Sequence, residues 1–146
     1  MKAIIQTVKD ASCSVGERLI SEMKEGLLVY FGVEKDDKIE DLEAFLLKIV
    51  RLRIYRGEED RKTNYSIMDR SSSIMLISQF TLCANLMRGN RPSFDNAMSG
   101  EKAKVFYDKA IEILRREKIN VSVGAFGEHM HIKYTNDGPE TFILSK

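Results

Sequence analysis

Side chains that could bind or activate a substrate follow an apolar run near the middle of this sequence. They are Ser78, Gln79, Phe80 and Thr81. In a regular strand over residues 73–83, Gln79 and Thr81 would share one face while Ser78 and Phe80 share the other. Buried hydroxyl and amide groups are costly unless they are hydrogen-bonded. Two interpretations stay open: a strand end that emerges into solvent, or the floor of a pocket that aims donors at a ligand.

Thr81 could act as a nucleophile only with a general base beside it. The chain has only two histidines, His129 and His131, and they alternate with Met130 along a predicted strand. We therefore expect both on a solvent-facing polar side, and as a zinc pair they lack a third ligand nearby. A serine-hydrolase elbow, a phosphate loop and a dinucleotide fingerprint are all absent from the sequence. The sequence predicts no metal and no cofactor.

Gly138 and Pro139 interrupt a C-terminal run that otherwise resembles a strand. Proline cannot donate to a ladder, so it belongs at a strand start, at an edge or in a special turn. Glycine permits unusual backbone shapes, and a cis peptide bond costs little before proline. Such a rigid element is suited to presenting backbone groups to a ligand. A plain turn before the last strand is the alternative.

A candidate phosphate-binding loop carries Arg88 and Arg91, which flank Gly89 and precede Pro92. Arginine suits phosphate because its donors act in pairs. An ordinary polar loop is the alternative interpretation. A second basic cluster is diluted by neighbouring acidic residues; it consists of Arg51, Arg53, Arg56, Arg61 and Lys62.

Composition indicates one soluble globular domain over residues 1–146, with 43% hydrophobic and 31% charged residues. The net charge of +1 means that any binding of nucleic acid must come from a local patch. No apolar run approaches the ~20 residues that span a membrane, and the N-terminus is too polar for a signal peptide. Two distant cysteines, Cys13 and Cys83, fit a reducing cytoplasm.

Hydrophobic periodicity predicts two helices among about seven strands. One helix is opened by Asp36 and Asp37, with Glu40 completing a capping-box pattern, and Ser99 caps the other. The run 27–33 is apolar on both faces, as expected for a strand covered on both sides. Further strands are predicted over residues 2–15, 73–83, 120–126, 128–135 and 140–144. The pattern predicts an α/β (α+β) fold in which packed sheets carry helices on one side.

Taken together, these segments resemble the D-aminoacyl-tRNA deacylases, also called D-tyrosyl-tRNA deacylases. The resemblance spans essentially the whole chain, and its diagnostic segments are Ser78–Leu82 and Asn136–Pro139. Further matching segments, in order, are Met1–Val8, Gly26–Val29, Gly32-Val33, Arg91–Phe94 and Phe126-Gly127 with Met130.

The resemblance implies a three-layer β/β/α sandwich that forms a homodimer with active sites at the subunit interface. It implies hydrolysis of the ester between a D-amino acid and tRNA, with the L-form spared. The Gly138–Pro139 bond would be cis and would reach into the partner's site. Steric exclusion of an L side chain leaves glycine unprotected, so we also expect cleavage of glycyl-tRNA.

The resemblance also assigns the site residues. The segment Ser78–Thr81 would form the catalytic pocket for the terminal adenosine and the aminoacyl group, while Met130, Asn136, Arg88 and Arg91 would contact substrate or tRNA. An aminoacyl ester is already activated, so orientation and aimed donors can suffice without a triad. The substrate's own ribose hydroxyl would then activate the attacking water.

Some positions depart from the family pattern. Leu86 and Met87 stand where many members carry polar or basic residues, and Glu140 replaces a common small apolar residue. Two other functions stay open: a module that binds RNA ends without turnover, and a hydrolase of the same fold that acts on other aminoacyl esters.

Overall fold

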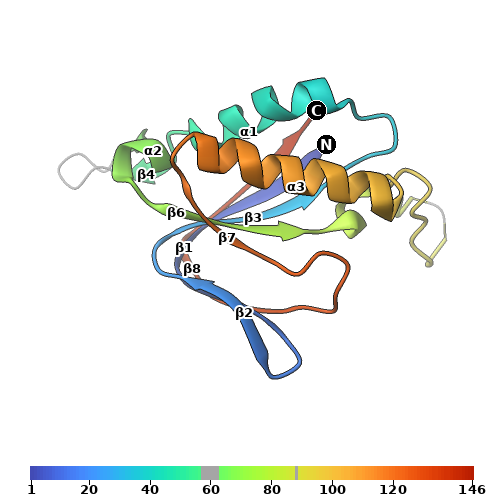
Figure 1. Cartoon of the computed structure of the whole chain (residues 1–146), viewed down its shortest axis with the longest axis horizontal. Helices are drawn as coiled ribbons and strands as arrows, with labels where there is room; N and C mark the ends of the chain where they lie inside the picture. The colour runs from blue at the N-terminus through green and yellow to red at the C-terminus, as the bar shows by residue number, and fades with distance from the viewer. Residues whose placement is uncertain (57–62, 88) are drawn as a thin grey trace.

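The structure, a computed structural model, describes residues 1–56, 63–87 and 89–146 (Figure 1). Its main sheet has the strand order β2-β1-β3-β6-β7, and β8 pairs with the other edge of β1. The pairs β3–β6 and β6–β7 are parallel, whereas β1 is antiparallel to β2, β3 and β8. The strands are β1 (Lys2–Val15), β2 (Arg18–Met23), β3 (Gly26–Gly32), β6 (Ser73–Ser78), β7 (Asn120–Val123) and β8 (His131–Ser145).

Two helices cover one face of this sheet, as Figure 1 shows. They are α1 (Leu42–Val50), which follows the short turn η1 (Ile39–Asp41), and α3 (Gly100–Arg116). A small hairpin lies at one end of the molecule and is formed by β4 (Tyr55–Arg56) and β5 (Thr63–Tyr65). The one-turn helix α2 (Ile67–Arg70) follows, with a capping box between Ser66 and Asp69. The described helices include none long and apolar enough to cross a membrane.

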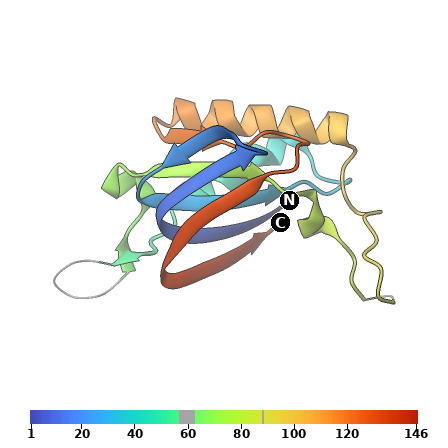
Figure 2. The same cartoon turned by 90° about the horizontal axis from the view of Figure 1, so that it is seen from below.

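The two longest strands, β1 and β8, bend together near their middles. Gln6 pairs with Thr141 and Val8 pairs with Asn136, so Thr7 alone faces the four residues Asp137–Glu140, which we call the apex. A second register shift lies between Val8 and Ala11. Figure 2 shows both strands running toward the end that carries β4 and β5 and turning back there. One continuous sheet therefore supplies two β layers.

Each layer boundary has its own apolar core. Between the sheet and the helices, Leu27, Val29 and Phe31 of β3 pack against α1 and α3. On the opposite face, Leu28 and side chains of the neighbouring strands pack against the bent part of β1. Besides Leu28, this second core contains Val8, Ala11, Cys13, Met23, Met75 and Ile77. The strand β3 is thus covered on both sides, as its uniformly apolar sequence predicts.

The mixed α/β fold with helices on one side is confirmed, but several element boundaries were wrong. The strand predicted over 73–83 ends at Ser78 and is followed by a turn of 3-10 helix, η2 (Phe80–Cys83). The strands predicted over 128–135 and 140–144 form the single strand β8. The capping box at Asp37 does not form: its carboxylate accepts hydrogen bonds from the Met1 ammonium and the Glu34 N–H instead.

Candidate active site

A pocket of about 520 Å³ opens where β6 ends. Its walls come from four segments: the end of β3, the end of β6 with the start of η2, the N-terminal half of α3, and the segment that leads into β8. Predicted site residues Ser78, Gln79, Phe80 and Met130 line it. Cavities of this size, mostly apolar with a few polar groups, are typical of small-molecule sites.

The end of β6 places backbone donors at the pocket. The Gln79 N–H still bonds the Phe31 carbonyl at 2.8 Å, but Gln79 then leaves the strand conformation with φ −146° and ψ 81°. The first N–H groups of a helical turn have no partner within it. Among the described residues, no backbone carbonyl accepts from the N–H of Phe80 or Thr81. If β6 had continued as a strand, these two N–H groups would have been hydrogen-bonded to its neighbours in the sheet.

Thr81 is held by an amide and not by a base. Gln79 Nε2 donates a hydrogen bond to Thr81 Oγ1, so these two side chains point to the same side across the turn. Thr81 is exposed and lies outside the described lining of the pocket. This contact cannot draw a proton from the hydroxyl, because a carboxamide N–H is a donor and not an acceptor.

Tyr107 fixes the opposite wall of the pocket. Its hydroxyl donates to the Leu76 carbonyl at 2.7 Å and accepts from the Gly124 N–H at 3.1 Å, so it ties β6 to the segment that follows β7. Burial raises the pKa of Tyr107 well above its usual value, so the group stays a neutral donor. No role was predicted for Tyr107 from the sequence, although it adjoins Phe106 on the buried stripe of α3.

Met130 reaches the pocket because residue 124 is glycine. A Cβ at Gly124 would lie 2.9 Å from Met130 Sδ and 3.0 Å from Ile77 Cδ1, closer than real contacts allow. The absent side chain therefore lets Met130 pack beside the end of β6.

The apex lies away from this pocket. Asp137, Gly138 and Pro139 are exposed, the Gly138–Pro139 peptide bond is cis, and Gly138 has φ +120°. The side chain of Asn136 bonds backbone, since its Nδ2 donates to the carbonyls of Thr7 and Glu140. Neither Asn136 nor the apex belongs to the described lining of the pocket in the same chain.

The whole chain matches one protein family. The sequence model of the family described as D-Tyr-tRNA(Tyr) deacylase matches residues 4–145. The chain belongs to this family. A D-aminoacyl-tRNA deacylase of Thermotoga petrophila is 42% identical over 144 residues, which cover 99% of this chain and 96% of the relative. One of Thermodesulfovibrio yellowstonii is 43% identical over 145 residues, which cover 99% of each.

Solved structures share the fold. One described as c-Myc DNA Unwinding Element Binding Protein has a TM-score of 0.93 at 36% identity, covering 100% of this chain and 99% of that chain. Another, described as a probable eukaryotic D-amino acid tRNA deacylase, has a TM-score of 0.81 at 16% identity and covers 98% of both chains. The resemblance to the deacylase family that the sequence motifs indicate is thereby confirmed.

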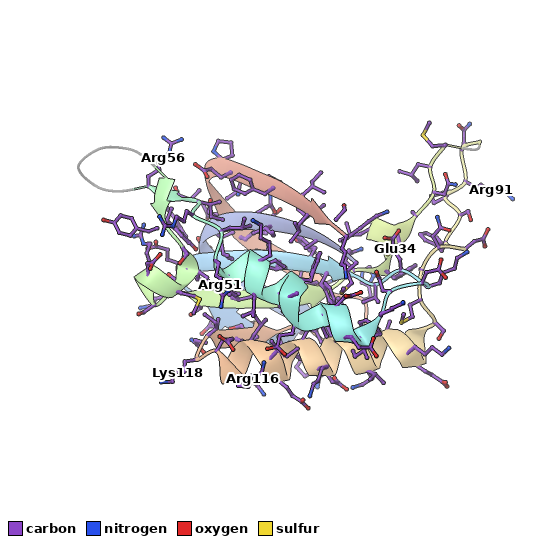
Figure 3. All side chains as sticks on the ribbon, turned by 90° about the horizontal axis from the view of Figure 1, so that it is seen from above. Glu34, Arg51, Arg56, Arg91, Arg116 and Lys118 are labelled. Carbon is purple, nitrogen blue, oxygen red and sulfur yellow. The ribbon has the colours of Figure 1, made fainter. Side chains whose placement is uncertain are left out.

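Of the two predicted arginines of this deacylase-family chain, the one that the structure describes lies outside the lining of the pocket. Arg91 is exposed on a segment that projects from one end of the molecule (Figure 3), and Arg88 lies outside the described residues. The segment is pinned by the bridge between Asn85 and Ser93. Its Phe94 packs edge-on against Phe80 at the pocket, with ring centroids 5.0 Å apart.

The histidines are exposed, as the strand pattern predicts, but His129 also lines the pocket. Its ring stands edge-on to His131 with centroids 5.2 Å apart. Within the described part of the chain, no group of three or more metal-ligating side chains comes together.

Replacement of Tyr107 by phenylalanine should cost about 1–2 kcal/mol of unfolding free energy, because the two hydrogen bonds of its hydroxyl are lost. The cost stays moderate because the Gly124 N–H also donates directly to the Leu76 carbonyl at 3.0 Å. Denaturant unfolding measures the change. Tyr65→Phe is the matched control: Tyr65 is 47% exposed, so we expect a change within about 0.5 kcal/mol. Equal stabilities of the two variants would contradict this role for the Tyr107 hydroxyl.

Proposed function

We propose that this protein is a single-domain hydrolase, over residues 1–146, that cleaves the ester bond of D-aminoacyl-tRNA. The products are a free D-amino acid and tRNA, and the activity removes D-amino acids from translation in the cytoplasm. The observation that carries the proposal is a pocket beside a strand end with free N–H donors, in a chain whose family and similar relatives bear deacylase names.

The free donors at the end of β6 suit the chemistry of ester hydrolysis. Attack of water on the ester carbonyl puts negative charge on its oxygen, and the N–H groups of Phe80 and Thr81 can stabilise that charge. One such donor contributes about 3–4 kcal/mol to lowering the barrier. Ser78 and Gln79 would orient the aminoacyl end, and correct orientation contributes up to ~7–11 kcal/mol.

The attacking water must lose a proton, and we assign its transfer to the neighbouring ribose hydroxyl of the substrate. This hydroxyl accepts the water proton while it passes its own proton to the departing ribose oxygen of the ester. The amide contact of Thr81 supports this assignment, because it leaves the hydroxyl without an activating base. Thr81 would then contribute its backbone N–H and hold Gln79 in position.

Chirality would be set by the apex of a second subunit. Gly138 and Pro139 are exposed, and their neighbour Glu140 pairs with Arg56, which lies at the end of the molecule opposite Arg91 (Figure 3). The pocket lies beside the segment that carries Arg91. A homodimer that places the apex of one protomer over the pocket of its partner would bring both elements together. Backbone carbonyls of Gly138 and Pro139 would then occupy the space that an L side chain needs.

The tRNA end would be held by few charges. Arg91 lies on the projecting segment, whose Phe94 packs against Phe80 at the pocket. We assign Arg91 and Arg88 to contacts with the tRNA and Met130 to contact with the terminal nucleoside. The net charge of +1 supports a small number of phosphate contacts and not a broad basic surface.

Matched D- and L-tyrosyl-tRNA test the proposal directly. We expect the purified protein to release D-tyrosine at least about a hundredfold faster than L-tyrosine, since steric exclusion of one enantiomer by a few kcal/mol gives ratios of this order. Ester loss in single-turnover reactions measures both rates. Binding without turnover would favour an RNA-end-binding module, and cleavage of the L-form would favour a hydrolase of other aminoacyl esters.

Replacement of Thr81 by alanine should lower the rate on D-aminoacyl-tRNA by less than about tenfold, because the backbone N–H remains while only an orienting contact worth about 1 kcal/mol is lost. Single-turnover hydrolysis measures the rate, and Thr135→Ala, at an exposed position of β8, is the control. A fall to the uncatalysed rate would mean that Thr81 is the nucleophile.

Glycyl-tRNA should also be cleaved. Glycine has no side chain to meet the apex, so a steric filter against L side chains leaves it accessible. Hydrolysis of glycyl-tRNA under the same single-turnover conditions measures this, with L-alanyl-tRNA as the control that should persist. Rapid loss of the D-form with glycyl-tRNA untouched would refute a purely steric filter.

A further inference from the structure

Thr7 is one of two polar residues in the described part of the chain that are buried, and it sits opposite the apex. Its side chain is 6% exposed. It is also the single residue of β1 between the pairs Gln6–Thr141 and Val8–Asn136, where β8 has four residues. A buried hydroxyl is retained at low cost only if it is hydrogen-bonded.

The hydroxyl of Thr7 is used to hold the apex. Thr7 Oγ1 donates to the Asp137 carbonyl at 2.6 Å, immediately before Gly138. The Thr7 carbonyl accepts from Asn136 Nδ2 at 3.0 Å, and the same nitrogen donates to the Glu140 carbonyl at 3.1 Å. Three hydrogen bonds thus fix both ends of the apex, and none of them relies on the ladder that the register shift interrupts. We call Thr7 and Asn136 the brace.

Charged contacts of the apex are weaker anchors. Lys9 pairs with Asp137 at 3.3 Å, but both side chains are more than half exposed. Arg56 pairs with Glu140 at 3.4 Å, and the Arg56 side chain is 64% exposed. Exposed ion pairs contribute little and are screened by salt. The buried brace is therefore the contact that defines where the apex stands.

We propose that Thr7 and Asn136 are positioning residues for chiral selection, which they control by fixing the Gly138 and Pro139 carbonyls relative to the partner's pocket. The inference rests on the proposed function. Thr7 lies outside the described lining of the pocket and touches no reacting atom, so the brace sets which substrates are excluded and not how the ester is broken.

The decisive comparison is Thr7→Val against Thr7→Ser. Valine matches threonine in shape without its hydroxyl, whereas serine keeps the donor. We expect Thr7→Val to lower the ratio of D- to L-tyrosyl-tRNA hydrolysis about tenfold, chiefly by a faster L-rate, as expected for loss of a hydrogen bond worth about 1.4 kcal/mol. Thr7→Ser should restore most of the ratio. Thr135→Val, at an exposed threonine of β8, should leave it unchanged.

A second readout is independent of activity. Amide hydrogen exchange over residues 136–141 should be faster in Thr7→Val than in Thr7→Ser or in the unsubstituted protein, because the apex opens more easily. If Thr7→Val does not fold, Asn136→Ala takes its place with the same expected loss of selectivity and faster exchange.

These outcomes separate the two proposals. A protein without substitutions that cleaves no D-aminoacyl-tRNA would overturn the proposed function, while the exchange comparison still tests the brace. Where that activity is present, an unchanged D-to-L ratio in the valine variant would overturn the inference alone. Unchanged exchange, or a serine variant that behaves as valine does, would overturn it as well.

Discussion

The structure depends on one constraint: β1 and β8 must bend together while they stay paired. Their ladder runs from Lys2–Ser145 to Ser14–His131, with register shifts at the bend. The bend folds one sheet into two layers, which encloses the second apolar core around Leu28 and Met75. The same bend leaves four residues of β8 opposite one residue of β1, and these residues become the exposed apex. Layering and the candidate selectivity element thus have a single structural origin.

The pocket follows from a second interruption of regular structure. Because β6 stops at Ser78, the chain turns into a 3-10 helix, and within the described part of the chain no backbone carbonyl accepts from the N–H of Phe80 or Thr81. Tyr107 and Gly124 secure the other wall, the first by bridging two backbone groups and the second by leaving room for Met130. Strand ends of this kind offer donors without the cost of removing them from a sheet, which suits the proposed role of orienting an already activated ester.

The sequence predicted the two helices and the doubly covered strand β3, because local hydrophobic periodicity indicates them. Its motifs predicted the family. The sequence could not predict where β6 ends. The residues Ser78 to Cys83 are compatible with either a strand or a turn, and only pairing with β3 and β7 determines which one forms. Nor could it predict the hydrogen bonds by which the Asn136 carboxamide and the Thr7 hydroxyl hold the backbone, because β1 and β8 lie more than a hundred residues apart in the sequence. The role of Tyr107 was not predicted, because the position of a tyrosine on an apolar helical stripe does not indicate the hydrogen-bond partners of its hydroxyl.

The central claim is that the pocket of one subunit and the apex of the other form each active site, and mixed dimers test it most directly. Ala103→Phe would fill the pocket, and Gly138→Ala would disturb the apex, since its Cβ would lie 2.6 Å from Glu140 Cγ at φ +120°. The first variant alone should be inactive, and the second should cleave both D- and L-tyrosyl-tRNA. Refolded with the first variant in large excess, the second should regain selectivity for the D-form, because nearly every open pocket then faces the intact apex of its partner. A mixture whose D-to-L ratio stays that of Gly138→Ala alone would contradict the account.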